Sequence, residues 1–326
     1  MLLTTFLTVA QPIQKITPTA ETKTQTTTTS MYDVPIWELN DEFTYKVNEI
    51  SMNITDEAQS LRLDFSMDEL PLIVTNTTGD FYTLTFNTAM NAFGYFNTNP
   101  GDGPVNISIT IDDLPVQGQV LIEKATLGLK DFSLSFVDQK KFTFNIIEQP
   151  YLTLPNFLKK FTVKVTSNLD MESNTSVDLL TFPMQTGITW NLSSVNITAN
   201  GLIESPLLNL IYLINYILNL LNIEILPPEI AALLPIIDVK EALTQLMGGN
   251  WFEVPVIPYA FFCLNKENIT VPAGVFEAFN ITVLGGLGQC FFAPTAGCII
   301  LMTGEFQDVI PFFKNIDLEL ISTTYS

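Results

Sequence analysis

The sequence predicts a mainly β fold: a large curved antiparallel sheet, or half-barrel, with helices covering its concave face. Apolar and polar residues alternate along much of the chain, which is typical of strands with one buried and one solvated face. Turn residues separate these strands at short intervals, as expected for a meander. One apolar stretch between Ser205 and Met247 interrupts the strand pattern with helical spacing.

The first thirty residues differ from the rest of the chain. Residues 1–10 form a short apolar run that ends in Thr8-Val9-Ala10, so we expect a signal peptide cleaved after Ala10. Residues 11–31 include a Thr-rich, low-complexity stretch that we interpret as a spacer. Residues 32–326 are then expected to form a single half-barrel domain with a helical lid insertion at 205–249.

Strand patterns begin near Val34 and continue to about Gly201. Leu61, Leu63 and Phe65 alternate with Arg62 and Asp64, which predicts that the first set is buried. The same pattern recurs at 82–86, 107–111, 132–136 and 161–165, and strands resume at Trp251. Turns are predicted at 99–104, 149–150 and 285–288.

The apolar stretch begins with seventeen residues, 207–223, that contain no charge. Asn and Tyr recur there at steps of three and four, which places them on one stripe of a helix. Pro227-Pro228 ends this helix, the apolar segment 230–237 follows, and a second helix is predicted from Asp238 to Gly248-Gly249.

Three environments are open to this apolar stretch: the protein's own core, an apolar ligand, or a membrane. The Asn side chains argue against a membrane span, because an amide without a partner is costly in hydrocarbon. We therefore expect a lid, with membrane contact left open. Its candidate cavity-lining residues are Leu207, Leu210, Ile211, Leu213, Ile214, Ile217, Leu218, Leu221, Leu233, Ile236 and Leu243.

Composition excludes several classes of function. The net charge is −20 and the 14 Lys and Arg form no basic cluster, which argues against a nucleic-acid partner. The chain contains no His, which removes the commonest general base, the usual nucleophile–base pairs and most zinc sites. Acidic pairs such as Asp112-Asp113 have turn-like contexts. We expect no enzyme, no metal and no cofactor, with a carbohydrate-active enzyme as a distant third interpretation.

Eight Asn-x-Ser/Thr sequons favour an extracytoplasmic glycoprotein, although several would arise by chance in a chain so rich in Asn and Thr. The glycosylation candidates are Asn53, Asn76, Asn106, Asn174, Asn191, Asn196, Asn268 and Asn280.

Three cysteines, Cys263, Cys290 and Cys298, lie in the last quarter of the chain. Outside the cell, one disulfide with one unpaired thiol is a natural reading, and any of the three pairings is open. The alternative is that all three are small buried hydrophobic residues.

Three segments resemble a known family. Val271-Pro-Ala-Gly-Val-Phe276 resembles a V-P-A-G-x-F hairpin, Phe291–Gly297 resembles a Y-Y-S-P-x-x-G turn, and Phe182–Trp190 resembles an F-P-L-x-x-G-x-x-W segment. In this order they are similar to extracytoplasmic β-proteins of the outer-membrane lipoprotein carrier and mycobacterial surface-lipid lipoprotein superfamily, and we expect an archaeal member. The resemblance implies structural roles for Gly187, Trp190, Pro272, Gly274, Phe276, Pro294 and Gly297.

The resemblance also implies a half-barrel whose concave apolar face is covered by helices and in some members holds acyl chains. The leading expectation is therefore a secreted or cell-surface protein that binds or carries an apolar, lipid-like ligand without catalysis. The alternative is a structural or adhesive glycoprotein of the cell envelope with a dry core and no ligand. The sequence leaves the oligomeric state open.

Overall fold

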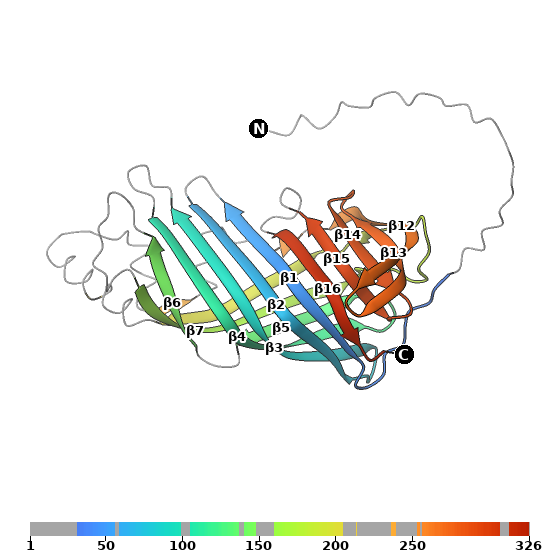
Figure 1. Cartoon of the computed structure of the whole chain (residues 1–326), viewed down its shortest axis with the longest axis horizontal. Coiled ribbons are helices and arrows are strands. Elements are labelled where there is room, and N and C mark those ends of the chain that lie inside the picture. The colour runs from blue at the N-terminus through green and yellow to red at the C-terminus, as the bar shows by residue number, and fades with distance from the viewer. Residues whose placement is uncertain are drawn as a thin grey trace, which may run out of the picture. The chain divides into compact units, whose positions relative to one another are not determined.

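The computed structural model describes residues 31–55, 59–98, 105–136, 140–147, 160–204, 213, 236–238, 253–254, 256–306 and 313–325. Residues 31–326 belong to one compact unit. Every element that the described part of this unit forms is a β-strand (Figure 1).

The strands before residue 205 are β1 (Glu42–Thr55), β2 (Gln59–Asn76), β3 (Phe81–Thr98), β4 (Val105–Glu123), β5 (Leu129–Phe136), β6 (Lys140–Ile147), β7 (Lys160–Val177), β8 (Thr189–Leu192) and β9 (Val195–Glu204). The later strands are β10 (Ile236–Asp238), β11 (Glu253–Val254), β12 (Ile257–Val271), β13 (Gly274–Val283), β14 (Gly288–Ala293), β15 (Cys298–Glu305) and β16 (Phe313–Thr323). The four alternating segments expected after residue 80 fall within β3, β4, β5 and β7, as the period-two pattern predicts.

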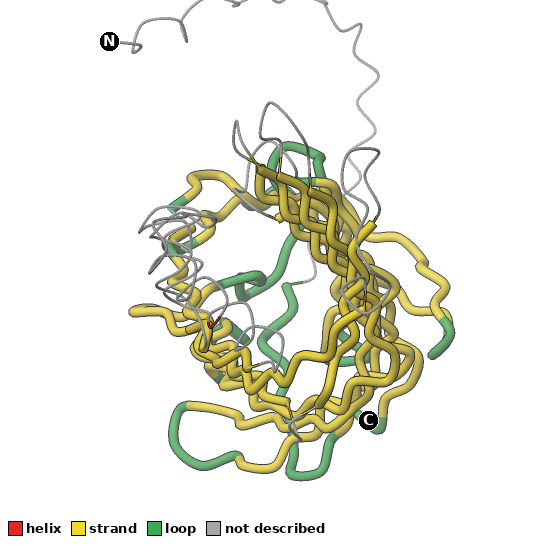
Figure 2. The backbone as a smooth tube through the Cα atoms, turned by 90° about the vertical axis from the view of Figure 1, so that its left-hand side faces the viewer, coloured by secondary structure: helices red, strands yellow, loops and turns green. Residues whose placement is uncertain are grey.

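All described strands belong to one antiparallel sheet. Its order is β10-β9-β7-β5-β4-β3-β2-β1-β16-β15-β14-β13-β12-β8, with β11 also beside β9 and β6 beside β4 and β7. Strands β8 and β9 are separated in the chain only by residues 193–194, yet β8 is the last strand of this order and β9 is the second strand from its other end. The sheet therefore curls into a nearly closed, barrel-like ring, which is visible when it is viewed end-on (Figure 2). The predicted large antiparallel sheet is confirmed, and it curves further than a half-barrel.

A cluster of aromatic side chains packs on one face of the sheet near the start of the compact unit. The indole Nε1 of Trp37 donates to the Gly297 carbonyl at 2.9 Å, and the Trp37 backbone N–H donates to the Tyr82 hydroxyl at 3.0 Å. The Trp37 ring lies 5.0 Å from the rings of both Phe43 and Tyr82. These contacts seat the segment before β1 on the face of the sheet that carries the buried core, named here the core face.

The predicted lid is corrected in one place. Ile236–Asp238, expected to belong to an apolar cover and the start of a helix, form strand β10 and pair with Leu202–Glu204 of β9. This part of the insertion extends the sheet, because its backbone pairs with the end of β9, which would otherwise be an open edge. Leu213 is 51% exposed, and the other lid candidates lie outside the described residues. Among the described residues, no helix is long and apolar enough to cross a membrane.

Candidate functional site

A row of apolar side chains crosses five neighbouring strands on the core face. Cross-strand pairing joins Ile316 to Ile50, Ile50 to Phe65, Phe65 to Ala92, and Ala92 to Ile111. All five side chains pack against the core but are only half-buried. We call this set the apolar row. Neighbours at directly opposed positions share one face of a sheet, so the row forms a continuous apolar strip.

The adjacent positions along the strands are better covered. Val47 of β1 and Met67 of β2 are paired with each other on the same face as the apolar row, and both are buried. On β1 and β2 the core is therefore closed at the positions of Val47 and Met67, whereas at the next core-facing positions, Ile50 and Phe65, its apolar lining is only partly covered. Partly covered apolar surface on a concave face is the usual setting of a site for an apolar ligand.

A β-bulge in β1 brings polar residues onto the other face of the same strands. Val47 pairs with Leu318 and Glu49 pairs with Asp317, so Asn48 is an extra residue without a partner on β16. Because Asn48 is an extra residue, the alternation of inward and outward side chains shifts by one position after the bulge. As a result Ile50 joins the apolar row, while Glu49 lies on the opposite face, named here the polar face.

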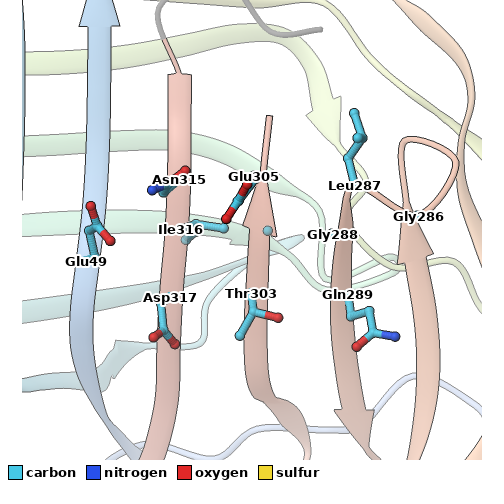
Figure 3. Close-up of a pocket in the computed structure, with 11 residues that line it drawn as sticks. Glu49, Gly286, Leu287, Gly288, Gln289, Thr303, Glu305, Asn315, Ile316 and Asp317 are labelled. Atoms are coloured by element: carbon cyan, nitrogen blue, oxygen red, sulfur yellow. The ribbon is translucent and has the colours of Figure 1, made fainter. Parts of the chain in front are cut away.

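The polar face contains a pocket of about 420 Å³ over β1, β16, β15 and β14 (Figure 3). Glu49 opposes Asp317, Asp317 opposes Thr303, and Thr303 opposes Gln289, which makes a transverse row of polar side chains. The remaining polar side chains of the lining are Asn315 and Glu305, which oppose each other one position away. Carboxylate and amide oxygens thus dominate the lining and give it negative charge.

Hydrogen bonds tie this pocket to the neighbouring strand. Ser51 is fully buried, and its hydroxyl lies within hydrogen-bond distance of Glu49 Oε1 and, at 2.6 Å, of Asp64 Oδ1. Arg62 Nε approaches Asp64 Oδ2 at 2.8 Å, but Arg62 is well exposed and such surface pairs contribute at most about 1 kcal/mol. Asn315 Oδ1 is enclosed and receives no hydrogen bond within the described part of the chain.

The acidic residues do not converge as metal ligands do. The described residues contain no group of three or more His, Cys, Asp or Glu side chains that could hold a metal ion. The polar pocket is therefore a set of hydrogen-bond acceptors spread along a sheet rather than a coordination sphere.

The three cysteines are free and buried in this structure. Cys263 and Cys290 oppose Ile281 from its two sides, so they lie two strands apart, roughly 10 Å. Cys298 opposes Ala293, three residues along β14 from Cys290, again roughly 10 Å. A disulfide needs Cα atoms closer than about 7 Å, so none of these pairs can form one without backbone movement.

Burial also makes the thiols unreactive. Desolvation raises the pKa of Cys263 to about 11 and that of Cys298 to about 12, and it raises the pKa of Cys290 still further. The protonated thiol is a poor nucleophile and a poor metal ligand. The three cysteines therefore act as small core residues.

The structure separates the sequons by accessibility. Asn280 is only 5% exposed and its Nδ2 donates to Glu267 Oε1 at 2.6 Å, so a bulky glycan has no room at this position in the folded chain. Asn76, Asn191 and Asn268 are exposed, and Asn53 is half-buried within β1. The other three candidates, Asn106, Asn174 and Asn196, lie in β4, β7 and β9.

The motif residues in the hairpins shape the backbone. Val271 opposes Gly274, so Pro272 and Ala273 form a two-residue connection between β12 and β13. Phe276 is the third residue of β13. Gly187 has φ +85°, and its N–H donates to the Cys263 carbonyl at 2.7 Å.

The other motif turn lies between β14 and β15. Gly297 has φ +68° and its N–H donates to the Pro294 carbonyl at 3.2 Å, while a Cβ at Gly297 would come within 2.7 Å of the Tyr325 ring. Trp190 stacks on Phe261 at 5.3 Å and donates to the Asp178 carbonyl. These positions set turns and packing.

Comparison with known proteins gives no relative: no family model, no curated protein and no solved structure matches this chain. The function is therefore inferred from the core face and the polar face of the sheet. Sequence reasoning singled out neither the five residues of the apolar row as a set nor the polar pocket. The alternation at 61–68 indicated that Phe65 was buried, but the neighbours of Phe65 become visible only with the strand register.

Proposed function

We propose that this protein binds or carries an apolar, lipid-like ligand without catalysis, as a secreted or cell-surface protein. The observation that carries the proposal is the apolar row: Ile316, Ile50, Phe65, Ala92 and Ile111 line the concave side of a barrel-like sheet and remain half-buried. Small-ligand sites are typically concave and mainly apolar, and the mouths of β-barrels are common places for them. The proposal extends the lipoprotein carrier resemblance, in which acyl chains occupy this side of the sheet.

The sequence-based helical segments of the 205–249 insertion outside β10 remain part of this proposal. The first of them, 207–223, supplies apolar surface without charge, which suits a cover over an apolar row. A ligand bound between such a cover and the row would contact hydrocarbon on both sides. Burial of the five side chains by a ligand would contribute about 25 cal/mol per Å² of apolar surface removed from water, before the cost of ordering the ligand.

The dry-core alternative is favoured by one specific observation. Val47 and Met67 are buried, and the aromatic cluster around Trp37 fills the neighbouring part of the core. If the same filling continued along the strands, the protein would be a structural or adhesive envelope component and no ligand would be needed.

Ligand extraction separates the two readings. The full chain is purified without detergent, and native mass spectrometry together with organic extraction is expected to show a stoichiometric apolar ligand. A preparation that lacks bound lipid, and that also fails to take up a fluorescent fatty acid, would contradict the carrier proposal and support the dry-core reading.

A pair of substitutions on β3 localises the ligand. Ala92→Trp adds an indole to the apolar row and is expected to abolish uptake of the fluorescent fatty acid. Phe93→Trp is the matched control, because Phe93 is the next residue on the same strand, is exposed and lies on the polar face. Equal loss of uptake in both variants, with unchanged circular dichroism, would place the ligand elsewhere.

A further inference from the structure

We propose that Asn76 is an N-glycosylation site that takes its glycan from a polyprenyl-phosphate-linked sugar donor. The inference goes beyond the apolar-ligand proposal: it rests on the extracytoplasmic location proposed above and does not depend on a bound ligand. The sequon Asn76-Thr77-Thr78 lies at the end of a hairpin, because Asn76 is the last residue of β2 and Phe81 is the first residue of β3. Asn76 and Thr78 are both exposed. A glycan attached here would extend into solvent without displacing any core side chain.

The side chain of Asn76 is already held in a defined conformation. Its Oδ1 accepts a hydrogen bond from the Thr78 N–H at 2.9 Å and another from the Thr78 hydroxyl at 2.8 Å. This Asx turn brings the hydroxyl of the third sequon residue against the amide that would be modified. No described residue accepts a hydrogen bond from Nδ2 of Asn76, so the nitrogen that forms the new bond is free to react.

Hydrogen bonds from Lys124, in the connection between β4 and β5, stabilise the turn. The Lys124 backbone N–H donates to the Asp80 carbonyl at 2.9 Å, and Lys124 Nζ donates to the Thr77 carbonyl. Both contacts restrain the backbone of the hairpin, and neither involves the Asn76 amide or the Thr78 hydroxyl. They therefore leave the Asn76 amide and the Thr78 hydroxyl accessible while restraining the backbone between them.

The other described sequons lack this combination. Asn280 is buried, Asn53 is half-buried within β1, and Asn191 Oδ1 is occupied by the Tyr259 N–H at 2.9 Å. Asn268 is exposed, but it lies in the extended strand β12, where side chains two residues apart are separated by roughly 7 Å. Asn76, by contrast, is exposed, and its Oδ1 accepts a hydrogen bond from its own sequon Thr hydroxyl.

The chemistry balances with one co-substrate. Nδ2 of Asn76 forms a bond to the anomeric carbon of the donor sugar, and the bond from that carbon to the phosphate oxygen breaks. The amide loses one proton to a base of the transferase, and the lipid (di)phosphate leaves with the electron pair. Two hydrogen bonds to Oδ1 draw electron density from the amide carbonyl, which makes the departing N–H proton more acidic.

The folded full chain is incubated with a purified oligosaccharyltransferase and a polyprenyl-diphosphate oligosaccharide, and attachment is mapped by intact mass and peptide mass spectrometry. We expect glycan at Asn76 and none at Asn280. N76Q should lose that adduct, and Thr78→Val should lose it as well, since valine has the shape of threonine without the hydroxyl. Thr77→Val is the matched control and should retain the adduct.

Two results would overturn the assignment. One is an unmodified Asn76 in a reaction that glycosylates an added sequon peptide. The other is an adduct of equal occupancy in Thr78→Val, which would show that the Thr78 hydroxyl contributes nothing. Circular dichroism of each variant confirms that loss of the adduct does not reflect loss of the fold.

Discussion

The two faces of strands β1 and β16 differ sharply although they are built from alternate residues of the same segments. On the core face, Ile50 and Ile316 continue the apolar row, while on the polar face Glu49 and Asp317 begin the acidic lining of the pocket. A single extra residue, Asn48, sets which side chain lies on which face beyond the bulge. The comparison shows that local backbone register, rather than composition, decides where apolar and polar chemistry gather in this sheet.

The largest expected effect contrasts the closed core with the apolar row. Phe43 is almost completely buried, so Phe43→Ala is expected to lower the free energy of unfolding by about 3–5 kcal/mol. Phe65→Ala should cost only about 1–2 kcal/mol, because a half-buried ring loses less transfer free energy. Urea unfolding of both variants measures the difference. Equal losses would mean that the apolar row belongs to a solid core.

The next largest effect concerns a glycine on β4. A Cβ at Gly118 would lie 2.2 Å from the Ser133 carbonyl oxygen and 2.3 Å from the Phe86 ring. Because the oxygen is backbone and cannot move cheaply, Gly118→Ala is expected to cost about 1–3 kcal/mol. Gly79→Ala tests the opposite case: nothing lies within 4 Å there, but φ is +66°, so its cost should reflect backbone strain of about 1 kcal/mol. Thermal unfolding distinguishes the two, and a harmless Gly118→Ala would contradict the packing described.

A smaller effect tests the polar face. Ser51→Ala removes the buried hydroxyl between Glu49 and Asp64 and should cost about 1.5 kcal/mol, the lower end of the range for a hydrogen bond to a charged group. Ser66→Ala is the control, because Ser66 lies on the same face of β2 without an equally buried position. A Ser51→Ala variant as stable as the control would show that the hydroxyl does not organise this face.

The smallest expected effect concerns Asp178, a partly buried carboxylate beside the core. Burial raises the pKa of Asp178, with Glu123 adding to the rise and a hydrogen bond with Thr126 opposing it. A raised carboxyl pKa in the folded state means that stability is greatest at low pH and falls as pH rises through the folded pKa. Asp178→Asn should remove that loss and stabilise the protein at neutral pH, by less than about 1 kcal/mol because solvent screens a half-exposed group. Unfolding midpoints at pH 4 and pH 7 would reveal it: a stability difference identical in wild type and variant refutes the assignment.

Much of the fold follows from sequence because period-two alternation is a local signal. The strands containing Phe65, Ile109 and Phe132 were predicted from it, and the turn after Val283 follows from its three glycines. Strand order and closure are not local. No pattern in the sequence indicates that β8 and β9, which are neighbours in the chain, lie near the two opposite edges of the sheet. Ile236 was misplaced for a related reason, since a short apolar run does not distinguish a buried strand from a helix.

The candidate sites were less predictable than the fold. The apolar row and the polar pocket arise from cross-strand neighbours, so their members are separated by many residues in the chain. The bulge at Asn48 reverses the phase of the alternation in β1. The sequence carries a signal of this change, because the apolar residues shift from positions 43, 45 and 47 to positions 50, 52 and 54. Burial of Asn280 was hidden, because its sequon has the same Asn-Ile-Thr sequence as the exposed one at Asn268.

The pairing of β1 with β16 has a consequence for the order in which the protein can fold. Phe43 opposes Thr323, so β1 obtains one of its two neighbours only after all the intervening strands have been made. Until then β1 pairs with β2 alone and presents an open edge, which is a template for pairing with other chains. Contacts so distant in sequence also slow the search for the native arrangement. We therefore expect nascent chains to depend on chaperone protection of this edge, and refolding to be slow and concentration-sensitive.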